Sequence, residues 1–149
     1  MVRLLGVRAG ALLACRSVGA CSIVQRLVLW DPVPDGAGYL QILRRIQLTI
    51  LEGFHYLSRA ERREALHEYA GYRLSERMLE EFRLLDASAY ANVPKSKLYV
   101  VNTSSKARLS VQGVPHEVVR FACNWDTDLS NVMTAKLVLE RLTTCLTAS

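Results

Sequence analysis

Two glycines that flank an arginine mark the first segment of the chain with a spacing suited to catalysis. Residues 6–10 read Gly6-Val7-Arg8-Ala9-Gly10, the frame of the G-x-S-x-G turn in which a strand bends into a helix and exposes a serine nucleophile. Glycines suit both flanks because the apex is strained and neighbouring backbone comes close. The apex here is Arg8, whose permanently protonated guanidinium cannot act as a nucleophile. The motif therefore predicts a catalytic turn without its nucleophile.

The four cysteines indicate neither a metal centre nor a cofactor. Cys15, Cys21, Cys123 and Cys145 form no C-x-x-C pair, and no histidine stands at ligand spacing from them. Each lies among apolar residues, which favours buried free thiols in a reducing compartment and hence a cytoplasmic protein.

Composition is typical of one globular domain. The 149 residues are 50% hydrophobic and 22% charged, and 19 basic against 14 acidic residues give a formal charge of +5. The basic residues are spread along the chain, which argues against a nucleic-acid partner. No run of 18 uncharged apolar residues occurs, so we expect no transmembrane segment.

The first residues also have features of a targeting segment, which gives an alternative localisation. Arg3 precedes the apolar run "LLGVRAGALLAC", and no acidic residue occurs before Asp31. Secretory signals and organelle presequences share this pattern, although Arg8 in the middle of the run argues against a secretory signal. The alternative is an exported or organelle-targeted protein that loses about its first 20–30 residues.

Hydrophobic periodicity predicts strands that alternate with helices. The expected strands are 1–5, 23–30, 97–102 and 117–123. The expected helices are 9–18, 39–54, one from a capping box at Ser58 to Gly71, one capped by Ser75, and 130–146. Met78 and Leu137 are expected on the buried faces of the last two helices. This order predicts an α/β fold, with a mostly parallel sheet and helices on its faces.

Three stretches, "GVRAGALLA", "RLVLWDPVPDGAGYLQILR" and "YAGYRLSERMLEEFRLLD", resemble the C-terminal half of an α/β-hydrolase. The nearest subgroup is that of the serine-aminopeptidase-like and exosortase-associated hydrolases, over residues 4–100. The resemblance implies one domain with a partial hydrolase fold: a sheet core with the elbow in 1–35, a helical cap in 36–92, and the C-terminal sheet core and final helix in 93–149. It also implies a truncated chain, because several strands precede the elbow in the family. A partner chain would then cover the open sheet edge.

The resemblance assigns positions to the rest of a catalytic triad. The family's acid follows the strand "KLYVVN", where this chain offers Asn102 and no carboxylate, so Asp31 at the end of the preceding strand is the alternative acid position. No histidine follows the last strand. His55 and His67 fall in the implied cap, and His116 precedes the last strand, where a different register could bring it to the site.

Three interpretations of function follow. The first is an α/β-hydrolase-like protein of ester, thioester or peptide-hydrolase ancestry that lacks serine-hydrolase activity, because Arg8 replaces the nucleophile and no histidine completes the triad. The second is a non-catalytic scaffold or a module that binds a small acyl or carboxylate ligand. The third is the targeted small protein described above. Arg8 is expected either to form an internal ion pair with Asp31 or to bind the carboxylate or phosphate of a ligand.

Overall fold

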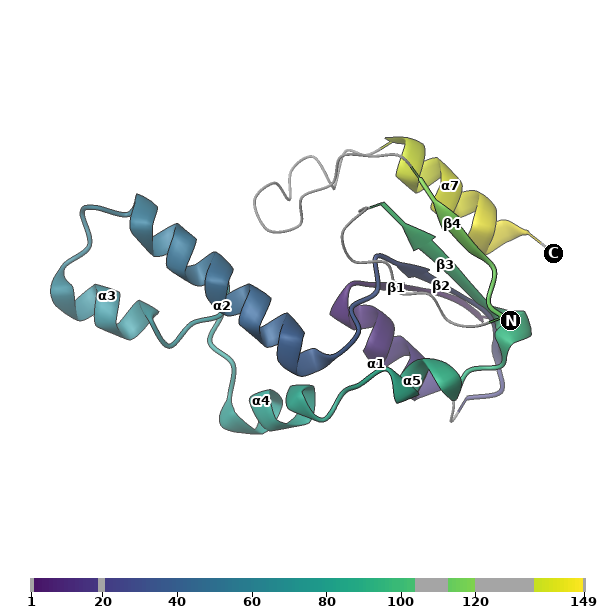
Figure 1. Cartoon of the computed structure of the whole chain (residues 1–149), viewed down its shortest axis with the longest axis horizontal. Coiled ribbons are helices and arrows are strands. Elements are labelled where there is room, and N and C mark those ends of the chain that lie inside the picture. The colour runs from purple at the N-terminus through teal and green to yellow at the C-terminus, as the bar shows by residue number, and fades with distance from the viewer. Residues whose placement is uncertain (1, 19–20, 104–112, 120–135, 149) are drawn as a thin grey trace.

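A four-stranded parallel sheet forms the centre of the molecule (Figure 1). The computed structural model describes residues 2–18, 21–103, 113–119 and 136–148. The strands lie in the order β1 (Val2–Val7), β2 (Val24–Trp30), β3 (Leu98–Asn102) and β4 (His116–Val118). Helices connect or cover the strands, so the predicted α/β class is confirmed.

Helices pack on both faces of the sheet, which explains why β2 is apolar almost throughout. On one face, α1 (Ala9–Val18) and α5 (Ser88–Ala91) pack against Leu27 and Leu29. On the other face, α7 (Lys136–Thr147) packs against Val28 and Trp30. Alternate residues of β2 therefore contribute to two different apolar clusters.

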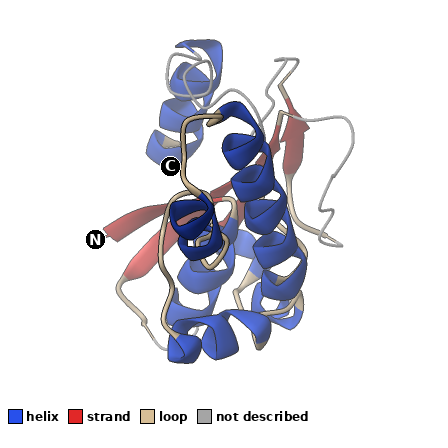
Figure 2. Cartoon of the chain, turned by 90° about the vertical axis from the view of Figure 1, so that its left-hand side faces the viewer, coloured by secondary structure: helices blue, strands red, loops and turns tan. Residues whose placement is uncertain are grey.

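The insertion between β2 and β3 forms a helical arm that projects from the sheet (Figure 1) and points toward the viewer in Figure 2. We use "helical arm" for residues 36–83. Its helices are α2 (Gly36–Gly53), α3 (Arg59–Ala65) and α4 (Glu76–Arg83). A short 3-10 helix, η1 (Lys95–Lys97), precedes β3.

The root of the arm is closed by a contact that only glycine allows. The N–H of Gly36 donates to the carbonyl oxygen of Leu85 at 2.8 Å. A Cβ at Gly36 would lie 1.9 Å from the carbonyl oxygen of Phe82. The start of α2 and the end of α4 therefore meet backbone to backbone.

The outer part of the arm is organised by one buried side chain, Gln47, which is 2% exposed. Its amide nitrogen donates to the carbonyl oxygen of Ala65 at 2.9 Å, and its amide oxygen accepts from the N–H of Gly71 at 2.6 Å. The capping box between Ser58 and Glu61 is confirmed. The predicted end of this helix at Gly71 is wrong, because α3 ends at Ala65 and the chain then makes a tight turn.

Several other sequence expectations need correction or fall outside the described residues. Met78 is 44% exposed and Leu137 is 65% exposed, so neither lies on a buried face. The predicted strand 117–123 starts one residue earlier, at His116, and residues 120–123 lie outside the described residues. So do residues 130–135 of the predicted last helix and Cys123. In the described part of the chain, no helix is long and apolar enough to cross a bilayer.

Candidate functional site

The turn from β1 into α1 has the geometry that the glycine spacing predicts at its apex. Arg8 has a φ of 52°, in the left-handed region that an L-residue adopts at a cost. Its N–H donates to the carbonyl oxygen of Trp30 at 3.0 Å, and its carbonyl oxygen accepts from the N–H of Ala11 at the same distance. A Cβ at Gly6 would lie 2.7 Å from the Cα of Ala11. The strained apex and the first glycine are therefore confirmed.

The second glycine of the motif does not have the role expected of it. A Cβ at Gly10 would meet no atom within 4 Å. Gly10 lies inside α1, so its missing side chain leaves open space rather than room for neighbouring backbone. The close approach of neighbouring backbone that the motif predicts at both glycines therefore occurs at Gly6 and not at Gly10.

Asp31 follows β2 at the same edge of the sheet as Arg8, because Val7 and Trp30 are register partners on neighbouring strands. Asp31 also has a positive φ, 43°, and is 2% exposed. Its carboxylate accepts a hydrogen bond from the N–H of Thr103 at 2.6 Å and another from the Thr103 hydroxyl. The expected ion pair between Arg8 and Asp31 is not among the ion pairs of the described residues.

The root of the helical arm lies against the elbow. The guanidinium carbon of Arg8 is 5.9 Å from the ring centroid of Tyr39 on α2, and Arg8 is half-buried. Tyr39 in turn stacks on Phe82 of α4, with ring centroids 6.5 Å apart. Two aromatic rings from the arm therefore form an apolar wall beside the cation.

The histidines do not complete a triad at this edge. All three are exposed, and His55 and His67 belong to the arm. His116 starts β4 and is level with Gly6, but β2 and β3 lie between them. Three strand spacings amount to about 14 Å. The structure therefore brings Arg8 and Asp31 to one edge and leaves His116 apart from them.

The described cysteines are free thiols, and most of them are buried. Cys15 of α1 is buried, and burial raises the pKa of its thiol from 9.0 to about 12, so it is protonated at neutral pH. Cys15, Cys21 and Cys145 are all free thiols. The predicted burial is confirmed for Cys15 and Cys145, whereas Cys21 is half-buried. The described residues contain no cluster of three or more potential metal ligands.

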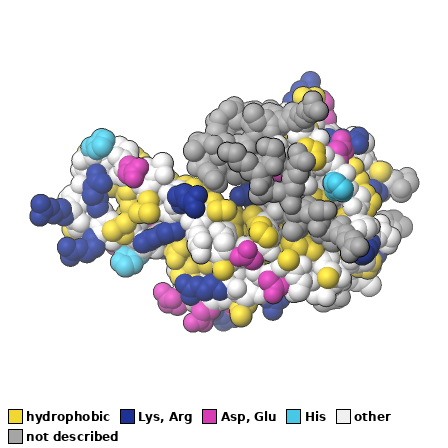
Figure 3. All heavy atoms as spheres, in the orientation of Figure 1, with side chains coloured by type: hydrophobic (Ala, Val, Ile, Leu, Met, Phe, Trp, Pro, Cys, Tyr) yellow, Lys and Arg dark blue, Asp and Glu magenta, His cyan; other side chains and the backbone are white. Residues whose placement is uncertain are grey.

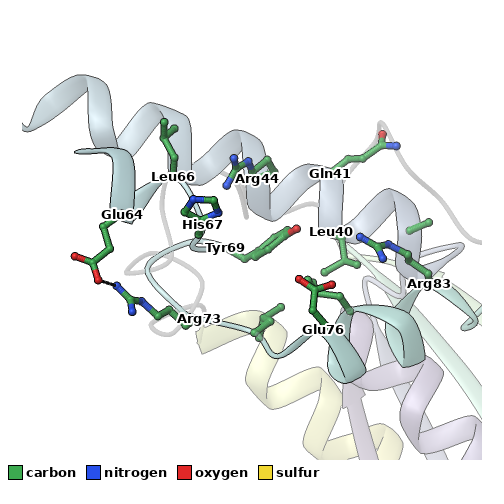
Figure 4. Close-up of a pocket in the computed structure, with 13 residues that line it drawn as sticks. Leu40, Gln41, Arg44, Glu64, Leu66, His67, Tyr69, Arg73, Glu76 and Arg83 are labelled. Atoms are coloured by element: carbon green, nitrogen blue, oxygen red, sulfur yellow. Dashed lines mark hydrogen bonds and ion pairs between the residues drawn. The ribbon is translucent and has the colours of Figure 1, made fainter. Parts of the chain in front are cut away.

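A second concave region, missed by the sequence analysis, lies on the arm itself (Figure 4). We call it the arm pocket; its volume is about 670 Å³. It is lined by Ala37, Leu40, Gln41, Arg44, Glu64, Leu66, His67, Tyr69, Arg73, Leu74, Glu76, Leu79 and Arg83. On the face shown in Figure 3, basic side chains and histidines gather at the outer part of the arm around apolar ones. The spacing of residues 37, 40, 41 and 44 on one helical face was the available sequence signal.

Comparison with known proteins adds no family to this description. No protein-family model matches the chain, and no curated protein matches it. The α/β fold and a left-handed strand-to-helix turn with arginine at its apex are established by the structure alone. Kinship with the α/β-hydrolases stays a hypothesis.

Proposed function

We propose that this chain is an α/β-hydrolase-like protein without serine-hydrolase activity that binds the carboxylate of a small acyl ligand at its elbow. The observation that carries the proposal is the left-handed backbone of Arg8 at the turn from β1 into α1. That turn is where a serine hydrolase holds its nucleophile. A cation at this point attracts the negative end of a ligand instead.

The surroundings of Arg8 suit an anion with an apolar tail. The first N–H groups of a helix have no partners within the helix, and the helix dipole adds partial positive charge there. The first turn of α1 contains no acidic residue that would offset this charge. A guanidinium can bind a carboxylate through two parallel hydrogen bonds. Tyr39 and Phe82 offer an apolar surface for the rest of the ligand.

The same surroundings do not support acyl-enzyme chemistry. Covalent catalysis at an elbow needs a nucleophile and a base within hydrogen-bond reach of it. Arg8 cannot be that nucleophile, and His116 is separated from the elbow strand by two strands. Asp31 directs its carboxylate to Thr103. Among the residues that the structure describes, neither His116 nor Asp31 is therefore placed to act as a base at the elbow.

Calorimetric titration of the full chain with hexanoate tests the binding half of the proposal. We expect saturable binding that Arg8→Gln weakens at least tenfold, because Gln removes the charge and keeps a polar side chain. Arg16→Gln, an exposed arginine in the last turn of α1, is the matched control and should bind as the parent does. Equal affinity of the parent and Arg8→Gln would refute a role for Arg8.

Turnover of p-nitrophenyl butyrate tests the catalytic half. The parent chain and Arg8→Ser should both hydrolyse the ester at the buffer rate, because restoring the serine does not supply a base. Saturable turnover by the parent would overturn the proposal. Loss of that turnover in His116→Ala would then point to a different catalytic set.

A further inference from the structure

The arm pocket contains one charged side chain that is partly withdrawn from water, Arg44 of α2. Arg44 is half-buried, whereas every other arginine, glutamate and histidine of the lining is exposed. Water screens exposed charges, so they contribute little to an interaction, while a partly desolvated charge acts more strongly on its neighbours. The charge preference of the pocket therefore depends mainly on Arg44.

No carboxylate of the described residues neutralises Arg44. Its guanidinium donates one hydrogen bond, to the carbonyl oxygen of Glu68 at 3.3 Å, and takes part in none of the ion pairs among these residues. The Glu68 carboxylate accepts from the amide of Gln47 at 3.3 Å and lies 3.6 Å from the Nε of Arg73. A guanidinium carries several further N–H donors, and a partly buried cation without a counter-ion is unfavourable. An anion that enters the pocket would meet both needs.

The fold holds Arg44 in place beside an aromatic ring. The guanidinium carbon lies 5.9 Å from the ring centroid of Tyr69, which is half-buried in the lining. Two backbone hydrogen bonds between Tyr69 and Tyr72 close the turn that carries this ring. The same turn is tied to α2, because the N–H of Gly71 donates to Gln47, three residues after Arg44. Figure 4 shows Arg44 and Tyr69 among the side chains of the pocket. A ligand would therefore find the guanidinium and the ring already positioned.

The rest of the lining defines the body and the charge of a suitable ligand. Leu40 of α2 and Leu79 of α4 are each 5% exposed and close the floor, so an apolar body is favoured there. The lining contains three arginines and two glutamates, so a singly charged anion balances it and a cation increases its excess. The volume of about 670 Å³ lies within the range of small-molecule sites.

We propose that the arm pocket binds a small aromatic carboxylate, its acidic group on Arg44 and its ring over Leu40 and Leu79. Two parallel N–H groups of a guanidinium match the two oxygens of a carboxylate. A carboxylate carries one negative charge, whereas a phosphate monoester carries about 1.5 to 2 at neutral pH and would exceed the charge of the lining. The ring of Tyr69 adds an aromatic partner for that of the ligand. This site does not involve Arg8 or the elbow.

Three ligands that share a naphthalene ring and differ in charge test the proposal. They are 2-naphthoate, the neutral 2-naphthamide and the cationic 2-naphthylmethylamine, each titrated calorimetrically into the full chain. The titrations are repeated with Arg8→Gln, so that the carboxylate site proposed at the elbow does not contribute. In Arg8→Gln, 2-naphthoate should bind at least tenfold more tightly than the amide, and the amine should bind more weakly than the amide.

Two neighbouring arginines of α2 provide a matched pair of variants. Arg44 lines the pocket, whereas Arg45 is exposed and lies outside the lining. Arg44→Gln should weaken 2-naphthoate at least tenfold and leave the amide unchanged, because only the carboxylate depends on the positive charge. Arg45→Gln removes the same charge from the chain and should bind all three ligands as the parent does. Arg44→Lys retains the charge and should retain the preference for the carboxylate.

Far-UV circular dichroism of every variant shows whether the chain remains folded, so that a lost fold is not read as lost binding. Absence of saturable 2-naphthoate binding by folded Arg8→Gln would overturn the proposal. Equal affinities for the three ligands would overturn it too, since the pocket would then not recognise charge. Equal losses in Arg44→Gln and Arg45→Gln would assign the preference to the net charge of the chain and would equally contradict a site at Arg44.

Discussion

Replacing each glycine of the elbow by alanine separates the two roles that their symmetric spacing predicts. In the structure, a Cβ at Gly6 would lie 2.7 Å from the Cα of Ala11 and 3.2 Å from the carbonyl oxygen of Gly10. A Cβ at Gly10 would lie within 4 Å of nothing. We therefore expect Gly6→Ala to destabilise the chain and Gly10→Ala to stabilise it.

The magnitudes follow from these distances. Carbon atoms in good contact lie about 3.5–4.0 Å apart, so the added methyl at Gly6 would overlap Ala11 by about 1 Å. Because the atom it meets is backbone, β1 and α1 would have to move apart, and overpacking of this kind costs about 1–3 kcal/mol. Alanine recovers about 0.5–1 kcal/mol of backbone entropy at either position. The net expectation is a loss of about 1 kcal/mol for Gly6→Ala and a gain of about 0.5–1 kcal/mol for Gly10→Ala.

Urea unfolding followed by circular dichroism at 222 nm measures both variants against the parent. With unchanged slopes, the difference between the two midpoints gives their difference in free energy of unfolding. That difference should be about 2 kcal/mol, or about 4–8 °C in melting temperature for a chain of this size. The pair is its own control, since both substitutions are chemically identical and lie four residues apart.

Equal stabilities of the two variants would refute the close approach of α1 to β1 at Gly6. A destabilised Gly10→Ala would refute the open space beside Gly10, and with it our account of the elbow. Hexanoate affinity adds a second readout. Gly6→Ala should weaken binding because it displaces the turn that holds Arg8, whereas Gly10→Ala should not.

Two further predictions concern buried groups. Gln47→Leu removes the hydrogen bonds of a side chain that is 2% exposed and should lower the free energy of unfolding by about 3 kcal/mol. The backbone amides of residues 59–65 should then exchange hydrogen faster, whereas the control Gln41→Leu should leave their exchange rates unchanged. Unchanged exchange in Gln47→Leu would contradict the role of Gln47. Because burial raises the pKa of Cys15 from 9.0 to about 12, the native thiol stays protonated while the unfolded one ionises. The free energy of unfolding should therefore fall as the pH rises from about 9 towards 12. In Cys15→Ala, which lacks this thiol, it should fall less over the same pH range. At pH 8, mass-spectrometric mapping of iodoacetamide labelling should find Cys21 modified before Cys15, and the reverse order would contradict the burial.

The regular elements nearest the elbow were predictable because their signals are local. The helix 9–18 has the predicted bounds, and β2 ends at Trp30 because Pro32 follows and cannot continue the ladder. Caps at Ser58 and Ser75 were also read correctly, since each depends on side chains within three residues of it. Such features need no knowledge of the rest of the chain.

The errors arise where a partner is distant in sequence. α3 stops at Ala65 because Gln47, 18 residues earlier, accepts and donates the hydrogen bonds of the following turn. The predicted end at Gly71 came from glycine as a C-terminal helix signal, and such a local signal cannot detect the contact with Gln47. Met78 lies on the predicted face of α4 but is 44% exposed, because the arm projects from the sheet and has fewer neighbours to bury it.

In the candidate site, too, features with local causes were predictable and features that depend on distant residues were not. The sequence motif predicted the strained apex at Arg8, because the glycine spacing is itself a backbone signal. It did not predict that Asp31 would bond to Thr103, 72 residues away, which depends on β3 lying beside β2. The arm pocket was missed for the same reason, since α2 and α4 meet through contacts between residues distant in sequence, such as Gly36 with Leu85 and Tyr39 with Phe82.

Backbone strain at the carboxyl edge of the sheet is a further observation in favour of the ligand site that we propose there. Arg8 and Asp31 both have left-handed backbone, at φ 52° and 43°, and stand at the ends of neighbouring strands. Each conformation costs roughly 1–3 kcal/mol for a residue with a side chain, and glycine would remove the cost. Instead, each position holds a residue with an ionisable side chain: Arg8 is half-buried, and Asp31 is 2% exposed. Ligands of open α/β sheets bind outside the carboxyl ends of the strands. The strain and the charge at this edge therefore support the proposed binding of a carboxylate ligand beside Arg8.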